Sequence, residues 1–178
     1  MQTLLALVMK PLKLLAKPPD IIKAANTTYK CCIGRGGVAT NKKEGDGCSP
    51  AGTFPLSLVL YRQDRLPPPQ TKLPLLPIKK NHGWCDDPQH KDYNTLITTP
   101  HDGTFESLWR QDQLYDIVVV IDYNVGPVVP YKGSAIFMHL NSKNNLPTEG
   151  CVALKLDAML EILSKATPGA SIEISETS

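Results

Sequence analysis

The stretch that decides the fold is Gly133-Ser134-Ala135-Ile136-Phe137-Met138-His139, followed after a short gap by Pro147-Thr148-Glu149-Gly150-Cys151-Val152-Ala153-Leu154. Residues 134–140 are short, apolar and nearly free of charge, which predicts a buried strand. Alternation along that strand places Ala135, Phe137 and His139 on one face. The residues between the two runs are polar and include Pro147, so they predict a loop.

A histidine and a cysteine stand at the edges of these apolar runs, with Gly150 immediately before Cys151. A glycine at that place lets another backbone or a substrate approach closely. The leucines and methionine that follow have helical spacing and predict a helix over 157–165. A cysteine shortly before a helix N-terminus, with His139 within reach, is in an environment that favours the thiolate, which a nucleophile needs. Spacing alone favours the alternative, an inert buried cysteine that fills space.

These residues resemble the catalytic segment of the L,D-transpeptidase family of bacterial cell-wall enzymes. In that family a strand ending in His precedes a Ser/Thr-x-Gly-Cys element, and here the matching residues are His139, Thr148, Gly150 and Cys151. The resemblance implies that a peptidoglycan stem peptide acylates Cys151, that His139 is the general base, and that the N–H groups of Gly150 and Cys151 stabilise the oxyanion. Ser134 and Thr148 are then expected to lie beside the substrate. Ser134 or a backbone carbonyl is the candidate that orients His139.

The resemblance covers roughly residues 30–174 and includes a Thr/Ser-Pro-x-Gly-x-Phe type of turn at Ser49–Phe54. It implies a mostly β (α+β) fold, a β-sandwich-like arrangement of mixed sheets with one or two short helices. Two positions depart from the family pattern. Many members have a second His where this chain has Glu149, and many have Arg where it has Ala153. Both departures bear on substrate recognition more than on the nucleophile, and the missing Arg removes one carboxylate anchor.

A long loop is expected over residues 81–103, and long loops in compact domains are usually functional. In that interpretation Trp84 and Tyr93 form aromatic walls of a cleft, and Asp86 and Asp87 hold an ammonium group of a diaminopimelate-containing stem peptide. The alternative is that Asp87 simply starts a turn before proline. The remaining candidates for substrate contact come from resemblance to one subgroup or from the glycine-rich turn near the N-terminus. They are Asn94, and Arg35, which either holds an anion or is a solvated turn residue.

A metal site is conceivable at His82, Cys85 and His90, whose side chains are of types that zinc accepts. A Cys-x-x-Cys or His-Glu-x-x-His spacing is absent from the sequence. We therefore predict no metal and no cofactor.

The chain has 178 residues, of which 42% are hydrophobic and 20% charged, and its net charge is +2. These values predict one globular catalytic domain over residues 1–178. A basic stripe is missing, which argues against nucleic acid, and no apolar run reaches the roughly 18 residues of a membrane span. The five cysteines are predicted to be reduced. Oligomeric state stays open.

Localisation is where sequence and resemblance disagree. Residues 3–9 are apolar but short, lack a positive flank and predict a strand instead of a signal peptide. The family implies the periplasm or cell envelope, so a cytoplasmic location stays open as well.

Other segments complete the expected pattern. Residues 63–77 hold five prolines and predict a stiff connector, and 104–114 predict a short helix. Strands are predicted at 12–16, 27–33, 54–61, 115–123 and 171–174.

The function expected from the resemblance is L,D-transpeptidation through a Cys151 thioester. Hydrolysis by the same site, an L,D-carboxypeptidase activity, shares every step up to the thioester and stays open. Carbapenem β-lactams are expected to acylate the same cysteine. Two alternatives are a cysteine peptidase acting on proteins, and a non-catalytic peptidoglycan-binding module that has kept the fold.

Overall fold

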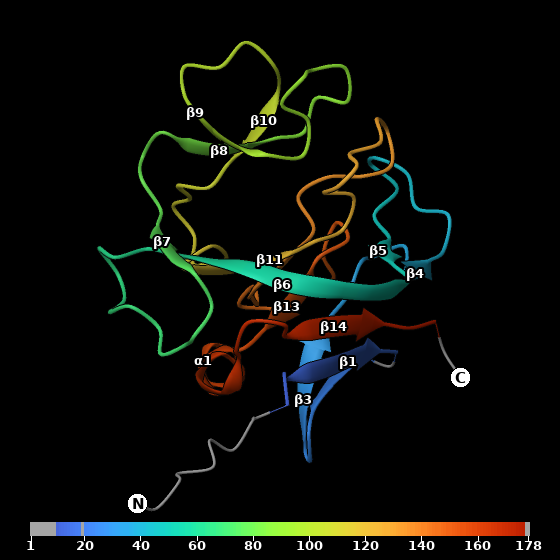
Figure 1. The fold of residues 1–178 in the computed structure, drawn as a ribbon, viewed down its shortest axis with the longest axis vertical. Coiled ribbons are helices and arrows are strands. Elements are labelled where there is room, and N and C mark those ends of the chain that lie inside the picture. Colours follow the sequence, from blue (N-terminus) through green and yellow to red (C-terminus); the bar gives the residue numbers. More distant parts are fainter. Residues whose placement is uncertain (1–9, 19, 177–178) are drawn as a thin grey trace, which may run out of the picture.

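The computed structural model describes residues 10–18 and 20–176, and Figure 1 shows their arrangement. The strand expected at residues 3–9 lies outside the described residues. The elements are β1 (Lys13–Lys17), β2 (Ile21–Ala24), β3 (Thr27–Cys32), β4 (Val38–Ala39), β5 (Ser49–Pro50), β6 (Gly52–Tyr61), β7 (Leu75–Pro77), β8 (His82–Cys85), β9 (Leu96–Thr98), β10 (Phe105–Ser107), β11 (Ile117–Ile121), β12 (Phe137–Leu140), β13 (Val152–Leu154), α1 (Leu156–Lys165) and β14 (Ser171–Ile174).

The main sheet is closed through β6, the longest strand. Following hydrogen-bonded neighbours from β6 through β11, β12, β13, β3, β2, β1 and β14 leads back to β6. Strand β6 achieves this by pairing with β14 through its first half, Gly52–Pro55, and with β11 through its second half. Parallel pairs such as β12–β13 and β1–β14 occur beside antiparallel ones. The prediction of a mostly β fold of mixed sheets is confirmed.

Strand β11 is covered on both faces, as its unbroken run of apolar residues predicts. Ile117, Val119 and Ile121 belong to the large core, which α1 covers with Met159 and its neighbours. The alternate residues of β11 belong to a second apolar cluster, which also contains Phe137 and Cys151. Ala135 packs against this second cluster, on the same side as Phe137, as the predicted alternation requires.

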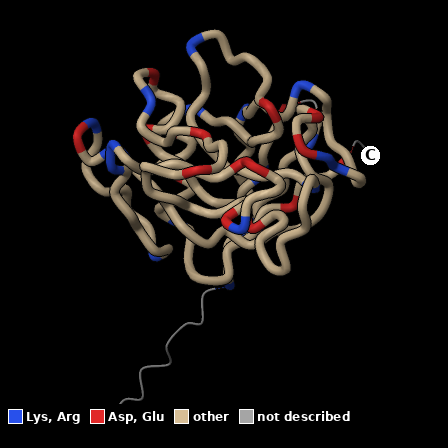
Figure 2. Tube along the Cα trace, turned by 90° about the horizontal axis from the view of Figure 1, so that it is seen from above, with Lys and Arg blue, Asp and Glu red and all other residues tan. Residues whose placement is uncertain are grey.

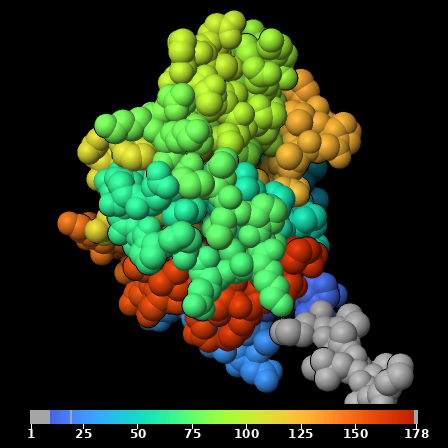
Figure 3. Space-filling model, turned by 60° about the vertical axis from the view of Figure 1, so that its left-hand side comes forward, coloured from blue at the N-terminus to red at the C-terminus, as the bar shows by residue number. Residues whose placement is uncertain are grey.

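Residues 81–107 differ from the expectation. The segment expected as one long loop contains β8 and β9, and β10 follows, making a three-stranded antiparallel sheet in the order β10-β8-β9. The helix predicted within 104–114 is wrong, because Phe105–Ser107 pairs with Gly83–Cys85. Pairing between segments distant in sequence overrides the local helical pattern there. In Figure 3 the yellow-green residues of this small sheet form the upper end of the molecule.

The C-terminal helix and strand lie nearly where the sequence predicts them. Helix α1 covers the predicted 157–165, and β14 matches residues 171–174. The proline-rich connector contains the short strand β7, which pairs in parallel with the end of β6. Acidic and basic residues are interspersed along the described chain (Figure 2). Among the described residues, no helix has the length and apolar character that crossing a bilayer requires.

Candidate active site

Two neighbouring parallel strands bring the candidate nucleophile and base to one cavity. In the β12–β13 pair, His139 lies opposite Ala153, and Cys151 stands directly before β13. Because side chains alternate along a strand, Cys151 and Ala153 face the same side. Both Cys151 and His139 line a cavity of about 510 Å³. A larger cavity of about 750 Å³ lies around Asn141 to Asn145 and is lined by neither of the two.

The Cys151 thiol is buried and held by backbone groups. Its S–H donates to the carbonyl oxygen of Ala135 at 3.2 Å, and the N–H of Phe137 donates to Sγ at 3.4 Å. Burial raises the pKa of Cys151 to about 12, and the nearby Glu106 carboxylate adds to the effect. The expected thiolate environment is therefore wrong for the resting protein, since β13 separates the cysteine from α1 and the thiol stays protonated near neutral pH.

The His139 imidazole is neutral and oriented by a backbone carbonyl. Its Nδ1 lies 2.8 Å from the carbonyl oxygen of Leu140. A carbonyl can only accept, so Nδ1 carries the proton and Nε2 keeps its lone pair. Burial lowers the pKa of His139 to about 4. The Tyr115 ring stands edge-on to the imidazole with a centroid separation of 5.4 Å, which fixes the plane of the ring.

The loop before Cys151 is stabilised by Thr148. Its hydroxyl donates to the Cys151 carbonyl at 2.7 Å and accepts from the Gly150 N–H at 3.1 Å. Gly150 has φ 132°, and a Cβ there would stand 2.7 Å from the Cys48 carbonyl oxygen. The sequence thus needs glycine at this place for both backbone conformation and space.

Ser134 does not orient His139. Its hydroxyl donates to Glu44 Oε2 at 2.8 Å, and the same oxygen accepts the hydroxyl of Tyr93. Tyr93 in turn accepts the N–H of Gly133 at 3.0 Å. Ser134 and Glu44 line the cavity, whereas Tyr93 is buried behind them with 3% of its surface exposed.

Trp84 and Asn94 are buried together behind the cavity. Asn94 Oδ1 accepts the indole N–H of Trp84 at 2.9 Å and the backbone N–H of Ala135 at 3.0 Å. Ala135 has φ 52°, an uncommon conformation for a residue with a side chain. Asn94 therefore holds the strained segment whose carbonyl accepts the Cys151 thiol. Trp84 packs edge-on against Phe137 at 5.0 Å between centroids.

The comparison with known proteins decides the family. The model of the L,D-transpeptidase catalytic domain (YkuD) matches residues 23–174. The chain belongs to the L,D-transpeptidase family. No curated protein sequence matches it. Among solved structures it is similar to L,D-transpeptidase 1 of Mycobacterium tuberculosis, with 13% identity and a TM-score of 0.41, over 92% of this chain and 58% of that one. The chain thus spans less than two thirds of that structure.

The two departures from the family pattern lie at the cavity. Glu149 lines it and pairs with Arg35, whose Nε stands 2.8 Å from one carboxylate oxygen and 2.9 Å from the other. Both side chains are largely exposed, at 56% for Arg35 and 75% for Glu149. Ala153 also lines the cavity, where an L,D-transpeptidase often has Arg. A different cation, Arg110, lines the same cavity.

The two acidic candidates, Asp86 and Asp87, have different positions in the structure. Asp86 lines the cavity and accepts the hydroxyl of Thr104 at 2.7 Å. Asp87 accepts the N–H of Gln89 at 3.0 Å, which is the turn-starting role weighed for it. Its contact with substrate stays a prediction, as do those of Trp84 and Tyr93.

Several residues of this L,D-transpeptidase cavity were missed by the sequence analysis. They come from the glycine-rich loop before β5, expected as a plain loop, and from β10 and the residues up to 115, expected as a helix and the start of a strand. For four of the five, the charge of the side chain was the only sequence signal. The missed residues are Lys42, Glu44, Glu106, Arg110 and Tyr115.

Proposed function

We propose that this chain is an L,D-transpeptidase that acts on peptidoglycan stem peptides through a Cys151 thioester. The observation that carries the proposal is that Cys151 and His139 line one cavity while Nδ1 of His139 is held by Leu140. That arrangement leaves Nε2 as the proton acceptor of a histidine that lines the cavity, in a chain that belongs to the family. The 178 residues act as one catalytic domain in this proposal.

Acylation begins with proton transfer from the Cys151 thiol to His139 Nε2. The thiol donates to Ala135 in the resting protein, so it first rotates towards the imidazole. The sulfur then attacks the carbonyl carbon of the third stem-peptide residue. The C–N bond to the terminal D-amino acid breaks, and the imidazolium returns its proton to the leaving amine. Thioester and free D-amino acid are the products.

The oxyanion is stabilised by backbone N–H groups. The Gly150 N–H donates to Thr148 in the resting protein, so we assign the first oxyanion contact to the Cys151 N–H. Gly150 supplies the second contact when its hydrogen bond to Thr148 opens. Donors aimed at the developing charge contribute the largest share of many acyl-transfer rate enhancements.

Deacylation regenerates the thiol. An acceptor amine gives up a proton to His139, attacks the thioester carbonyl and forms the new amide, which is transpeptidation. Water in the same place gives the carboxypeptidase outcome. Arg110 supplies a carboxylate anchor in place of the family arginine that Ala153 replaces. The substrate places the working enzyme in the cell envelope.

Mass spectrometry of the intact protein after brief exposure to a carbapenem tests the nucleophile. We expect one adduct, mapped to Cys151 and absent from Cys151→Ser. Cys48→Ser is the matched control, because Cys48 is another free thiol with part of its surface exposed. An adduct that persists in Cys151→Ser, or none in the wild type, contradicts the proposal.

Incubation with tetrapeptide muropeptides tests the reaction itself. Crosslinked products would indicate transpeptidation, and tripeptides alone would indicate hydrolysis. Binding without either product would favour the peptidoglycan-binding module, and cleavage of an unrelated protein would favour the peptidase alternative.

A further inference from the structure

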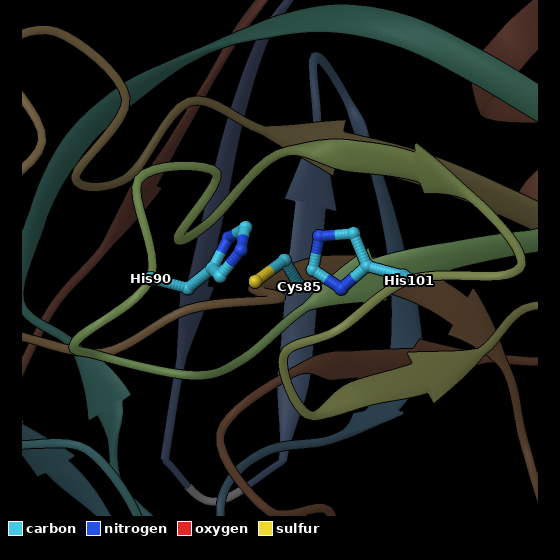
Figure 4. A group of neighbouring side chains, drawn as sticks. All are labelled: Cys85, His90 and His101. Atoms are coloured by element: carbon cyan, nitrogen blue, oxygen red, sulfur yellow. The ribbon is translucent and has the colours of Figure 1, made fainter.

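A cysteine and two histidines converge in the loops of the small three-stranded sheet, away from Cys151. One side-chain donor atom each of Cys85, His90 and His101 lies within 4.8 Å of the others. Figure 4 shows the two imidazole rings on either side of the Cys85 sulfur. Cys85 is fully buried, and the side chains of His90 and His101 are 14% and 8% exposed. Thiolate and imidazole are the ligand types that zinc prefers.

The cluster rests on a rigid frame. The Cys85 N–H donates to the Thr95 carbonyl at 2.9 Å, and its carbonyl accepts the Asn94 N–H at 2.8 Å. The two rings stand 4.4 Å apart between centroids. A Cβ at Gly103 would stand 3.1 Å from an atom of each ring, so the loop backbone packs directly against both. The donors are therefore held close together by backbone contacts on several sides.

Each imidazole has one nitrogen supported from outside the cluster. His90 Nε2 lies 3.0 Å from the Asp102 carboxylate, and His101 Nδ1 lies 3.2 Å from the Gly103 carbonyl. Histidines that ligate metals almost always donate their second N–H to a carboxylate or a backbone carbonyl, which fixes the tautomer. For His90 the proton is therefore on Nε2, and Nδ1 is the nitrogen that coordinates. His101 Nδ1 also accepts the Gly103 N–H at 3.1 Å, so in the metal-free protein the proton of this ring is on Nε2. Coordination through His101 Nε2 moves that proton to Nδ1, where it donates to the Gly103 carbonyl.

Asp92 supplies a carboxylate to the same space. Its Oδ2 stands 3.7 Å from His90 Nδ1 and 3.4 Å from His101 Nε2. Both separations are longer than good hydrogen bonds, although the second is a weak hydrogen bond between His101 Nε2 and the carboxylate. They match the spacing of about 3.3 to 3.8 Å between neighbouring ligand atoms of a tetrahedral zinc ion, as bond lengths of about 2.0 to 2.3 Å dictate. Asp92 thus lies beside both imidazoles but outside the group of three donor atoms that already converge, and it completes the fourth position only after its carboxylate shifts towards the Cys85 sulfur.

We propose that this chain binds one Zn²⁺ ion through Cys85, His90, His101 and Asp92. Binding releases the Cys85 thiol proton to solvent. It also replaces the hydrogen bond of 3.1 Å that the Asp92 N–H donates to His90 Nδ1. His82, the other metal-ligand candidate of the sequence, lies outside this group, and its Nδ1 accepts the Lys79 N–H at 3.3 Å.

The ion has a structural role. It ties the end of β8 to the loops on both sides of β9, and the residue after Cys85 is Asp86, which lines the catalytic cavity. A bound ion therefore stabilises one wall of that cavity without touching the reacting atoms. The competing possibility is a hydrogen-bonded cluster of histidines and aspartates that holds no metal.

Titration of the purified, metal-stripped protein with Co²⁺ tests the site directly. We expect one equivalent to produce a thiolate-to-cobalt charge-transfer band and the visible bands of tetrahedral cobalt, both bleached by one equivalent of Zn²⁺. Zn²⁺ alone should raise the melting temperature. Asp102→Asn should weaken Zn²⁺ binding by roughly 10-fold, because it removes an outer partner of His90.

Variants assign the ligands. Cys85→Ser should lose the charge-transfer band, and His101→Asn should lose the tetrahedral spectrum, with folding of each checked by circular dichroism. Cys151→Ser, His82→Gln and Cys48→Ser are matched controls that should keep both signals, which separates this site from the catalytic pair. A wild type that shows no tetrahedral cobalt spectrum, or a band that survives Cys85→Ser, overturns the proposal.

Discussion

The imidazole Nδ1 of His139 lies 2.8 Å from the carbonyl oxygen of Leu140, the next residue in the chain. This contact leaves Nε2 unprotonated in a ring whose pKa burial lowers to about 4. The neighbouring Cys151 has a pKa raised by burial to about 12. Between those values the pair is a neutral thiol and a neutral imidazole, so the base is ready while the nucleophile is formed during attack.

The buried, neutral His139 makes stability depend on pH. The unfolded chain protonates this histidine near pH 6.5, whereas the folded chain does so only near pH 4, because burial disfavours the charge. Unfolding therefore takes up a proton between those values. Stability is fully present above about pH 6.5 and falls as pH drops towards 4, by about 3 kcal/mol. Urea unfolding of the wild type at several pH values measures this slope.

His139→Gln is the matched variant for that measurement. It should lose most of the slope between pH 6.5 and 4, since glutamine does not titrate. His82→Gln is the control; burial also lowers the pKa of His82, but without the large shift of His139. Equal slopes in wild type and His139→Gln would show that His139 is not buried in its neutral form.

Gly150→Ala should disrupt the loop that carries Cys151. The new Cβ would meet the Cys48 carbonyl oxygen at 2.7 Å in a backbone with φ 132°. We expect a loss of about 3 kcal/mol or more in the free energy of unfolding. Gly37→Ala is the control, with φ 80° and open space around its Cβ, and should cost only about 1 to 2 kcal/mol. Similar losses in both variants would remove the steric argument.

Strong local patterns predicted much of the fold. The run Ile117–Ile121 required cover on both faces, and Met159 with its neighbours fixed one face of α1. The helix predicted at 104–114 is wrong because the conformation of this segment depends on its pairing with β8, about twenty residues away in sequence. Charge and helical spacing carry no information about such a partner. In the folded chain Phe105 pairs with Cys85, and this pairing makes residues 105–107 a strand.

The residues of the candidate site also fall into those that the sequence could predict and those that it could not. Cys151 and His139 were predictable as neighbours because one sequence motif contains both, and the parallel strands β12 and β13 bring them to the same cavity. Glu44 and Arg110 were not, since they reach the cavity from segments far away in the chain. Trp84 was expected as an aromatic wall of the cavity because residues 81–103 were expected to form one long loop lining a cleft. Its burial follows from the indole contact with Asn94, which only the folded chain reveals.

The Glu44 carboxylate should contribute measurably to stability. One of its oxygens accepts the hydroxyls of Ser134 and Tyr93. Glu44→Ala leaves both donors without that partner, and we expect a loss of about 2 kcal/mol, against about 1 kcal/mol for Ser134→Ala. Glu149→Gln is the control in an exposed ion pair and should show no measurable change. Chemical denaturation measures all three, and an unaffected Glu44→Ala would mean that solvent satisfies the two hydroxyls.

Arg110 should determine substrate affinity. It is held beside the cavity by two contacts with Asp112, at 2.8 and 2.6 Å, and lies over the Tyr115 ring at 5.1 Å. A fixed guanidinium binds a carboxylate better than a mobile one. Arg110→Gln should raise KM for tetrapeptide muropeptides by roughly 10-fold with a smaller effect on kcat, and Arg110→Lys should recover only part of it. Arg65→Gln, at an arginine paired with Asp116 outside this cavity, should leave KM unchanged. An unchanged KM in Arg110→Gln would exclude it as the anchor and leave the loss of the family arginine at Ala153 uncompensated.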